Sequence, residues 1–129
     1  DEYKLNISSQ QILIVAGDHG GRLYALISLI HLINYYEDKI PEGIIEDSPQ
    51  FNWRGMHLDC SRQFYSVSQI KRLLLYMALF KLNRFHWHLT DNEAWRLDIK
   101  SFPNLASDSS FRGYKHMIPP LYGTCSSLL

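Results

Sequence analysis

The sequence predicts an α/β protein with two modules, and two changes of residue pattern lead to this prediction. In residues 1–48, short alternating or apolar runs flank one long apolar segment with helical character. From residue 49 on, a strand, an amphipathic helix and a second strand follow one another with short connections. Such alternation of strands and helices is typical of the α/β class. We therefore expect one domain at 1–48 and another at 49–129.

The first module is expected to be a small α/β sandwich built on antiparallel strands. Residues 3–7 alternate apolar and polar side chains, and the apolar run 11–16 follows after two serines, which predicts a hairpin. Residues 22–36 predict a helix that is apolar around most of its circumference and is therefore buried between other elements. Residues 44–48 predict a short strand or a linker.

Two features of the chain have plain structural interpretations. The stretch GDHGG, residues 17–21, lacks the spacing of a phosphate-binding G-x-G-x-x-G loop, so it predicts a strand-to-helix turn. Cys60 ends an apolar strand and is expected to be a small core residue.

The second module begins with a βαβ unit. Residues 51–61 predict a strand that ends in polar side chains. Ser66 and Gln69 have the spacing of a capping box, and an apolar face then predicts a helix to about Phe80. Residues 83–89 predict the second strand, and a helical crossover implies parallel pairing.

A βαβ unit needs parallel neighbours to complete its sheet. After Lys100 the chain offers no clear further strand–helix pair, and the tail after Pro103 predicts loops. Residues 95–100 predict only a short excursion. The architecture of the second module is therefore expected to be incomplete.

The composition excludes some partners. Lys plus Arg and Asp plus Glu balance at 13 each, so we expect no nucleic-acid partner and no anionic membrane. Ser28 and His31 interrupt the longest apolar run, which is far shorter than a membrane span. Cys60 and Cys125 are too few for a disulfide framework. No signal peptide is visible and the chain begins at Asp1, so the localisation is unknown.

The predicted second strand presents a possible metal pair. Arg84, His86 and His88 share one of its faces, while apolar side chains share the other. Two imidazoles at i and i+2 can both reach an ion, and His57 on the first strand is the only evident helper. No complete ligand set is evident, so we assign no metal and expect interior histidines that bond to polar neighbours.

Arg62 and Asp91 are the candidate functional residues. Each lies just beyond the carboxyl end of a predicted strand. In parallel α/β barrels the strand-to-helix loops gather at that edge and carry the active site. Either residue is equally compatible with a plain surface charge.

Residues 48–105 resemble the opening of the catalytic barrel in glycoside hydrolase family 20, the β-N-acetylhexosaminidases. The matching pieces are P-x-F-x-W-R-G, L-D-x-S-R, M-A-x-x-K-L-N-x-F-H-W-H-L-x-D and W-R-x-x-I-K. Residues 3–48 resemble the end of the small domain that precedes this barrel, and 112–124 a loop of some bacterial members. Only the last five residues match nothing. The resemblance implies a small α/β sandwich followed by an incomplete (β/α)8 barrel, with its first two strands only.

The resemblance implies roles for both candidate residues. The Arg of L-D-x-S-R binds the hydroxyls of the terminal sugar in the family, which places this role on Arg62. A guanidinium fork can hold two vicinal hydroxyls. The Asp after H-W-H-L-x supports the general acid through a buried relay, which places a supporting role on Asp91. Asn92 departs from the family, which usually has a second Asp there.

The resemblance also implies that this chain is inactive alone. The family uses substrate-assisted retention, in which the acetamido oxygen attacks and an Asp–Glu pair on the fourth strand assists. The adjacent acidic pairs of this chain, at 1–2, 37–38 and 46–47, all precede the first barrel strand. We expect a truncated β-N-acetylhexosaminidase, a hydrolase without a cofactor whose family acts on N-acetylhexosaminides.

Two alternatives stay open. One is a metal-dependent hydrolase that uses His86 and His88. The other is a non-catalytic remnant that forms a homo-oligomer, because two parallel strands with free edges would otherwise be exposed.

Overall fold

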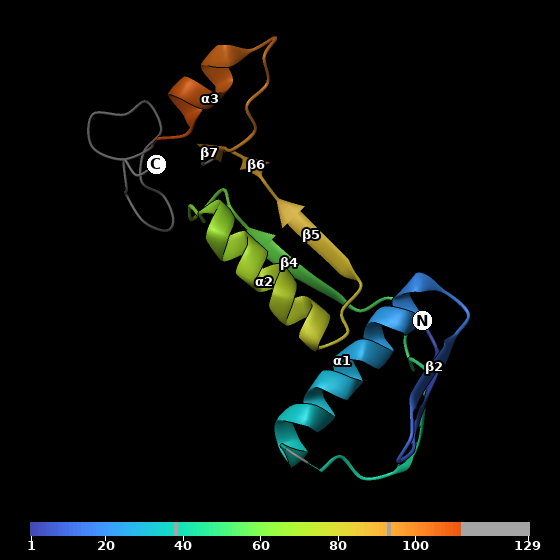
Figure 1. Cartoon of the computed structure of the whole chain (residues 1–129). Coiled ribbons are helices and arrows are strands. Elements are labelled where there is room, and N and C mark those ends of the chain that lie inside the picture. The colour runs from blue at the N-terminus through green and yellow to red at the C-terminus, as the bar shows by residue number, and fades with distance from the viewer. Residues whose placement is uncertain (38, 93, 112–129) are drawn as a thin grey trace. The chain divides into compact units, whose positions relative to one another are not determined.

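A computed structural model describes residues 1–37, 39–92 and 94–111. The elements are, in chain order, β1 (Tyr3–Ile7), β2 (Ile12–Ala16), α1 (His19–Tyr36), β3 (Gly43–Asp47), β4 (Gly55–Asp59), α2 (Val67–Leu79), β5 (Arg84–His88), β6 (Thr90–Asp91), β7 (Ala94–Trp95) and α3 (Pro103–Ser109) (Figure 1). Helices and strands alternate, so the α/β class is confirmed. The predictions for Asp38, for the loop 112–124 and for Cys125 lie outside the described residues.

The chain forms two compact units. One comprises Asp1–Arg54 with Leu75–Asn83, and the other comprises Gly55–Leu74 with the chain from Arg84 onward. No helix of the described residues combines the length and the apolar character that a membrane crossing requires.

The first unit contains an antiparallel sheet with the order β2-β1-β3. In β1, Leu5 pairs with Ile14 of β2 and Ile45 of β3, so the hairpin prediction is confirmed. The segment that the sequence left open as a strand or linker is the strand β3.

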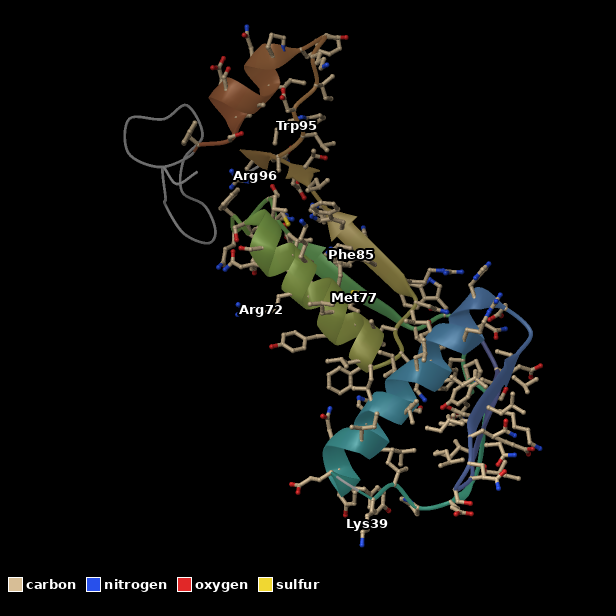
Figure 2. All side chains as sticks on the ribbon, viewed as in Figure 1. Lys39, Arg72, Met77, Phe85, Trp95 and Arg96 are labelled. Carbon is tan, nitrogen blue, oxygen red and sulfur yellow. The ribbon has the colours of Figure 1, made fainter. Side chains whose placement is uncertain are left out.

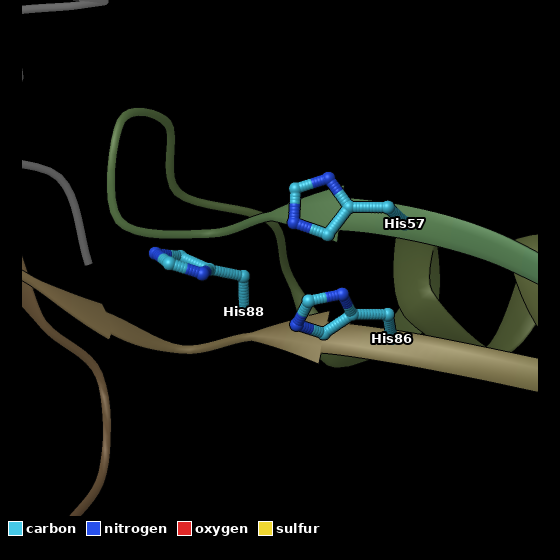
Figure 3. Close-up of side chains that lie close together, drawn as sticks. All are labelled: His57, His86 and His88. Carbon is cyan, nitrogen blue, oxygen red and sulfur yellow. The ribbon is translucent and has the colours of Figure 1, made fainter.

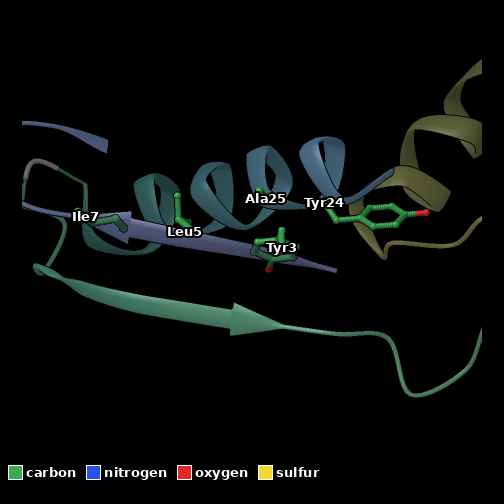
Figure 4. Close-up of a cluster of buried hydrophobic side chains, with 5 residues drawn as sticks. All are labelled: Tyr3, Leu5, Ile7, Tyr24 and Ala25. Carbon is green, nitrogen blue, oxygen red and sulfur yellow. The ribbon is translucent and has the colours of Figure 1, made fainter. Parts of the chain in front are cut away.

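The core of this unit lies between β1 and α1. Tyr3, Leu5 and Ile7 alternate with polar residues and point to one face, as the period of a strand dictates. They pack with Tyr24 and Ala25 of α1 (Figure 4). Leu5 and Ala25 are fully buried, which makes β1 the central strand in packing as well as in pairing.

The helix α1 begins at His19, three residues earlier than the sequence predicted. Asp18 caps it, because its Oδ1 accepts a hydrogen bond of 2.6 Å from the backbone N–H of Gly21. A Cβ at Gly21 would collide with the carbonyl oxygen of Glu2. The glycine is therefore kept for this close approach inside the first helical turn, and the GDHGG stretch is a capped strand-to-helix turn.

Lys81 ties the end of α2 to the first sheet. Its backbone has a positive φ of 56° and ends the helix, with its N–H donating to the carbonyl of Ala78. Its Nζ donates to Asp47 at 2.6 Å and to the hydroxyl of Tyr3 at 2.9 Å. The Lys81 hydrogen bond holds the pKa of Asp47 below its usual range. Burial would lower the pKa of Lys81, but its bonds to Asp47 and Tyr3 raise it overall.

Arg54 and Asn83 stand immediately before β4 and β5 and bond to each other. Asn83 Oδ1 accepts from the N–H of Arg54 at 3.0 Å, and the N–H of Asn83 donates to the carbonyl of Arg54 at 2.8 Å. The guanidinium of Arg54 also donates to the carbonyls of Lys81 and Phe51. These bonds fix the two chain segments side by side before the strands begin.

The second unit contains the predicted parallel pair. β4 pairs with β5 from Gly55 opposite Arg84 to Asp59 opposite His88. The connecting helix α2 starts with the predicted capping box: Ser66 Oγ accepts from the N–H of Gln69 at 3.3 Å, and Gln69 Oε1 accepts from the N–H of Ser66 at 2.8 Å.

The prediction of a loop-rich tail after Pro103 is wrong for the first part of that tail. α3 begins at Pro103, whose fixed φ suits the first turn of a helix. β6 and β7 form a two-stranded antiparallel ladder in which Asp91 pairs with Ala94. The short excursion predicted at 95–100 overlaps this ladder only at Trp95, and residues 96–100 contain no strand.

We predict that Leu5→Ala lowers the free energy of unfolding by about 2–5 kcal/mol, because it leaves a cavity at a fully buried position of the central strand. Urea denaturation followed by circular dichroism measures this change. Leu13→Ala on β2 is the matched control, because Leu13 is 48% exposed and its truncation should cost less than about 1 kcal/mol. Equal losses for both variants would contradict the described core.

Candidate functional site

A cluster of charged side chains lies at the carboxyl ends of β4 and β5. Asp59 is the last residue of β4 and stands opposite His88, the last residue of β5. Arg62 follows β4 by three residues, and Asp91 follows β5 by three. Because parallel strands end at the same edge of a sheet, these four residues meet there.

Arg62 is the centre of this cluster. Its Nη1 lies 2.8 Å from Oδ2 of Asp59 and 2.8 Å from Oδ2 of Asp91. The Arg62 side chain is 37% exposed, and those of the two acids are 29% and 27% exposed. The guanidinium is thus held in one orientation by two carboxylates and still reaches solvent.

Asp59 binds both the backbone and the side chain of the turn that follows β4. Its Oδ1 accepts hydrogen bonds from the N–H groups of Ser61 at 2.9 Å and of Arg62 at 3.2 Å. Partial burial would raise the pKa of Asp59, but these backbone bonds and the guanidinium together hold it below its usual range. Asp59 therefore stays ionised and shapes the turn that presents Arg62.

Both carboxylate oxygens of Asp91 have a hydrogen-bonding partner. Oδ1 accepts from the N–H of Asn92 at 2.7 Å, and Oδ2 lies 3.0 Å from Nε2 of His88. The Asn92 bond is the main cause that lowers the pKa of Asp91, with His88 and Arg62 adding to it against partial desolvation. Any residue except proline supplies this backbone N–H at 92, so Asn92 in place of the Asp that the resemblance implies leaves the bond in place.

Hydrogen bonds to Ala94 and Arg96 hold the loop between β4 and α2 in place. The fully buried Ser61 accepts from the N–H of Ala94 and donates to its carbonyl, at 3.1 and 3.0 Å. Arg96, which follows β7 and is labelled in Figure 2, donates from Nε to the carbonyl of Cys60 at 3.0 Å and from Nη1 to the carbonyl of Ser110 at 2.6 Å. These bonds join the β6–β7 ladder to the loop that carries Arg62.

Cys60 is a buried core residue, as predicted. It is 4% exposed, and its Sγ accepts a hydrogen bond of 3.3 Å from Nε1 of Trp87. Burial raises the pKa of the Cys60 thiol, so the cysteine is not an activated nucleophile.

The structure brings Arg62 and Asp91 into direct contact, although the sequence treated them as separate candidates. It adds Asp59 and His88, which the sequence did not assign to the site. The i, i+3 spacing of Asp59 and Arg62 within L-D-x-S-R was the available signal for one of them. His88 bonds to polar neighbours, as expected. The same expectation is wrong for His86, which is exposed and makes no hydrogen bond within the described residues. Both histidines lie beside His57 (Figure 3).

The cluster has the chemistry of a site for hydroxyl groups. A guanidinium supplies donors in a planar fork, and ionised carboxylates supply acceptors. A sugar hydroxyl is both a donor and an acceptor, so a pair of neighbouring hydroxyls can use both kinds of partner.

Comparisons with known proteins agree with this chemistry. Residues 51–126 match glycosyl hydrolase family 20, catalytic domain. The chain is 39% identical over 122 residues to a β-hexosaminidase of Vibrio furnissii, and this match covers 93% of the chain and 20% of the relative. It is also 39% identical over 104 residues to an N,N'-diacetylchitobiase of Vibrio harveyi, with 80% of the chain and 12% of the relative covered.

Solved structures give the same result. A GH20 exo-β-N-acetylglucosaminidase of Vibrio harveyi in complex with N-acetylglucosamine matches with a TM-score of 0.82 and 41% identity, over 95% of this chain and 20% of that one. A β-N-acetylhexosaminidase of Bacteroides fragilis matches with a TM-score of 0.79 and 32% identity, over 95% of this chain and 25% of that one.

The chain spans between 12% and 23% of the length of the curated relatives that it matches. The family match covers more than half of the chain, and the resemblance predicted from the sequence motifs is confirmed. The chain belongs to glycosyl hydrolase family 20.

Proposed function

We propose that this chain is the part of a β-N-acetylhexosaminidase that supplies the sugar-binding arginine and a supporting acid to the active site. The parent reaction is hydrolysis of terminal N-acetylhexosamine residues by substrate-assisted retention. The observation that carries the proposal is the position of Arg62, which two carboxylates hold at the carboxyl edge of a parallel strand pair.

In this proposal Arg62 donates to two vicinal hydroxyls of the terminal sugar. Asp59 and Asp91 keep the guanidinium oriented before the sugar arrives, so less rotational freedom is lost on binding. Asp91 acts as a positioning residue, because its oxygens are already engaged by Arg62, His88 and the Asn92 backbone.

We extend this proposal to the architecture of the chain. We infer that β4, α2 and β5 are the first βαβ unit of a (β/α)8 barrel, and that residues 1–48 are the end of the small α/β domain before it. The parallel pairing of β4 with β5 supports this assignment, as does a site at their carboxyl edge.

We also infer that the 129-residue chain is inactive alone. The family's Asp–Glu pair follows the fourth barrel strand, and no such pair follows β5 in this sequence. The relatives are β-hexosaminidases and chitobiases, and they give no support to a metal-dependent hydrolase.

A chimera tests the function. We would replace the matching segment of the Vibrio furnissii relative with this chain, whose identity of 39% should preserve the packing. We expect hydrolysis of a chromogenic N-acetylglucosaminide by the chimera and none by the 129-residue chain. Arg62→Lys should lower the kcat/KM of the chimera by about 100-fold or more, because lysine keeps the charge but loses the fork.

Arg72→Lys is the matched control, because Arg72 is exposed on the side of α2 away from β4 and β5 (Figure 2). Asp91→Asn should lower kcat more than it raises KM, as expected of a residue that does not touch the sugar. A folded chimera that is inactive would refute the proposed function of the chain. An Arg62→Lys variant with full activity would refute the role of Arg62. Turnover by the chain alone that Arg62→Lys abolishes would refute the inactivity.

We propose in addition that the isolated chain self-associates through β4 and β5. Among the described residues neither strand has a second partner strand. Met56 and Trp87 on these strands are 40% and 47% exposed, and an apolar cavity of about 520 Å³ lies between α2 and β5. A second copy of the chain would pair with the free edges and cover this apolar surface.

Light scattering at micromolar concentration should give a mass of at least two chains. Met56→Lys should shift the chain toward monomer, because a charge on the strand opposes pairing. Val15→Lys on β2, at a position that is 55% exposed in the other unit, should leave the mass unchanged. A strictly monomeric wild-type chain would rule out this association.

A further inference from the structure

Three histidines share one face of the β4–β5 pair. His57 stands directly opposite His86 in the register, and His88 follows two residues later on the same face. The ring centroids are 4.5 Å apart for His57 and His86, 5.7 Å for His57 and His88, and 6.3 Å for His86 and His88. Figure 3 shows the three rings projecting to the same side of the two strands.

The three side chains can offer ligand atoms to one point. One potential ligand atom from each histidine lies within 4.8 Å of the other two. His57 and His86 are exposed, and within the described residues neither ring makes a hydrogen bond or an ion pair. In the part of the chain that the structure describes, the ring nitrogens of both histidines are therefore left without a hydrogen-bond partner.

His88 is held by the charged cluster beside it. Its Nε2 lies 3.0 Å from Oδ2 of Asp91 and 3.4 Å from Nη1 of Arg62. Among the described residues these contacts engage Nε2, which leaves Nδ1 available to an ion. A histidine that binds a metal through one nitrogen and donates to a carboxylate through the other is the usual arrangement in metal sites.

We propose that His57, His86 and His88 bind one divalent first-row transition metal ion, and that Zn²⁺ is its natural occupant. Three imidazoles with a water molecule complete a tetrahedral zinc shell. Zn–N bonds of about 2.1 Å require nitrogens roughly 3.4 Å apart, so ligand atoms that lie within 4.8 Å of one another must close by at most about 1.4 Å. The two exposed side chains can rotate to do this. Mg²⁺ and Ca²⁺ are excluded, because they prefer oxygen ligands.

The register of β4 and β5 brings a third histidine to the H-x-H pair, which the sequence alone did not show. The sequence showed an H-x-H pair with one possible helper, and no metal was assigned. Pairing His57 opposite His86 turns the helper into a direct neighbour. The proposal concerns binding of the ion and does not depend on the glycosidase function of Arg62.

Titration of the chelator-treated chain with Zn²⁺ alone, measured by calorimetry, tests the site. We expect one ion per chain, with nitrogen and oxygen but no sulfur in its first shell by X-ray absorption. His57→Ala and His86→Ala should each weaken binding by at least tenfold. His19→Ala and His31→Ala are the matched controls on α1 and should bind as the wild type does.

Binding without one-to-one stoichiometry, sulfur in the first shell, or unchanged affinity in His57→Ala and His86→Ala would overturn the proposal. If those variants do not fold, the ring signals of the wild type decide by NMR. Zn²⁺ should shift the signals of His57, His86 and His88 and not those of His19 and His31. Shifts confined to other histidines would overturn the site equally.

Discussion

The parallel pairing of β4 with β5 is the constraint on which both candidate sites depend. Its register sets Asp59 opposite His88 and His57 opposite His86. The common end of the strands brings Arg62 to Asp91, and the two-residue period of a strand places the three histidines on one face. A slip of one residue would move His86 and His88 to the other face and separate them from His57.

Hydrogen bonds at both ends of the β4–β5 pair stabilise this register. Arg54 and Asn83 bond to each other one residue before the strands begin. At the far end, the N–H of Cys60 donates to the carbonyl of His88 at 2.8 Å, which continues the ladder into the loop that carries Arg62. The buried hydroxyl of Ser61 then fixes that loop on Ala94. The charged cluster is therefore positioned by backbone bonds more than by its own ion pairs, which are partly exposed and individually weak.

The sequence predicted those features whose signals are local. The alternation in residues 3–7, the capping box at Ser66 and the apolar period of α2 all depend on neighbours within one turn or one strand. The early start of α1 comes from the Asp18 cap, a local signal that was missed because GDHGG was interpreted as a turn. The close approach of Gly21 to the distant carbonyl of Glu2 could not be predicted. The contact of Arg62 with Asp91 and the position of His57 opposite His86 both depend on the register of β4 and β5. The residue pattern does not specify this register. The sequence motifs identified Arg62 and Asp91 as candidates, but their direct contact is known only from the structure.

The pKa of the Asp91 carboxyl group tests the charged cluster most directly, and carbon NMR can follow it in the wild-type chain and in Arg62→Gln. We predict that the Asp91 pKa lies below the ordinary value of 3.8 in the wild type and rises when the guanidinium is removed. The Asn92 backbone bond should keep part of the depression in the variant. A wild-type pKa at or above 3.8, or one that Arg62→Gln leaves unchanged, would contradict the charged cluster at the ends of β4 and β5.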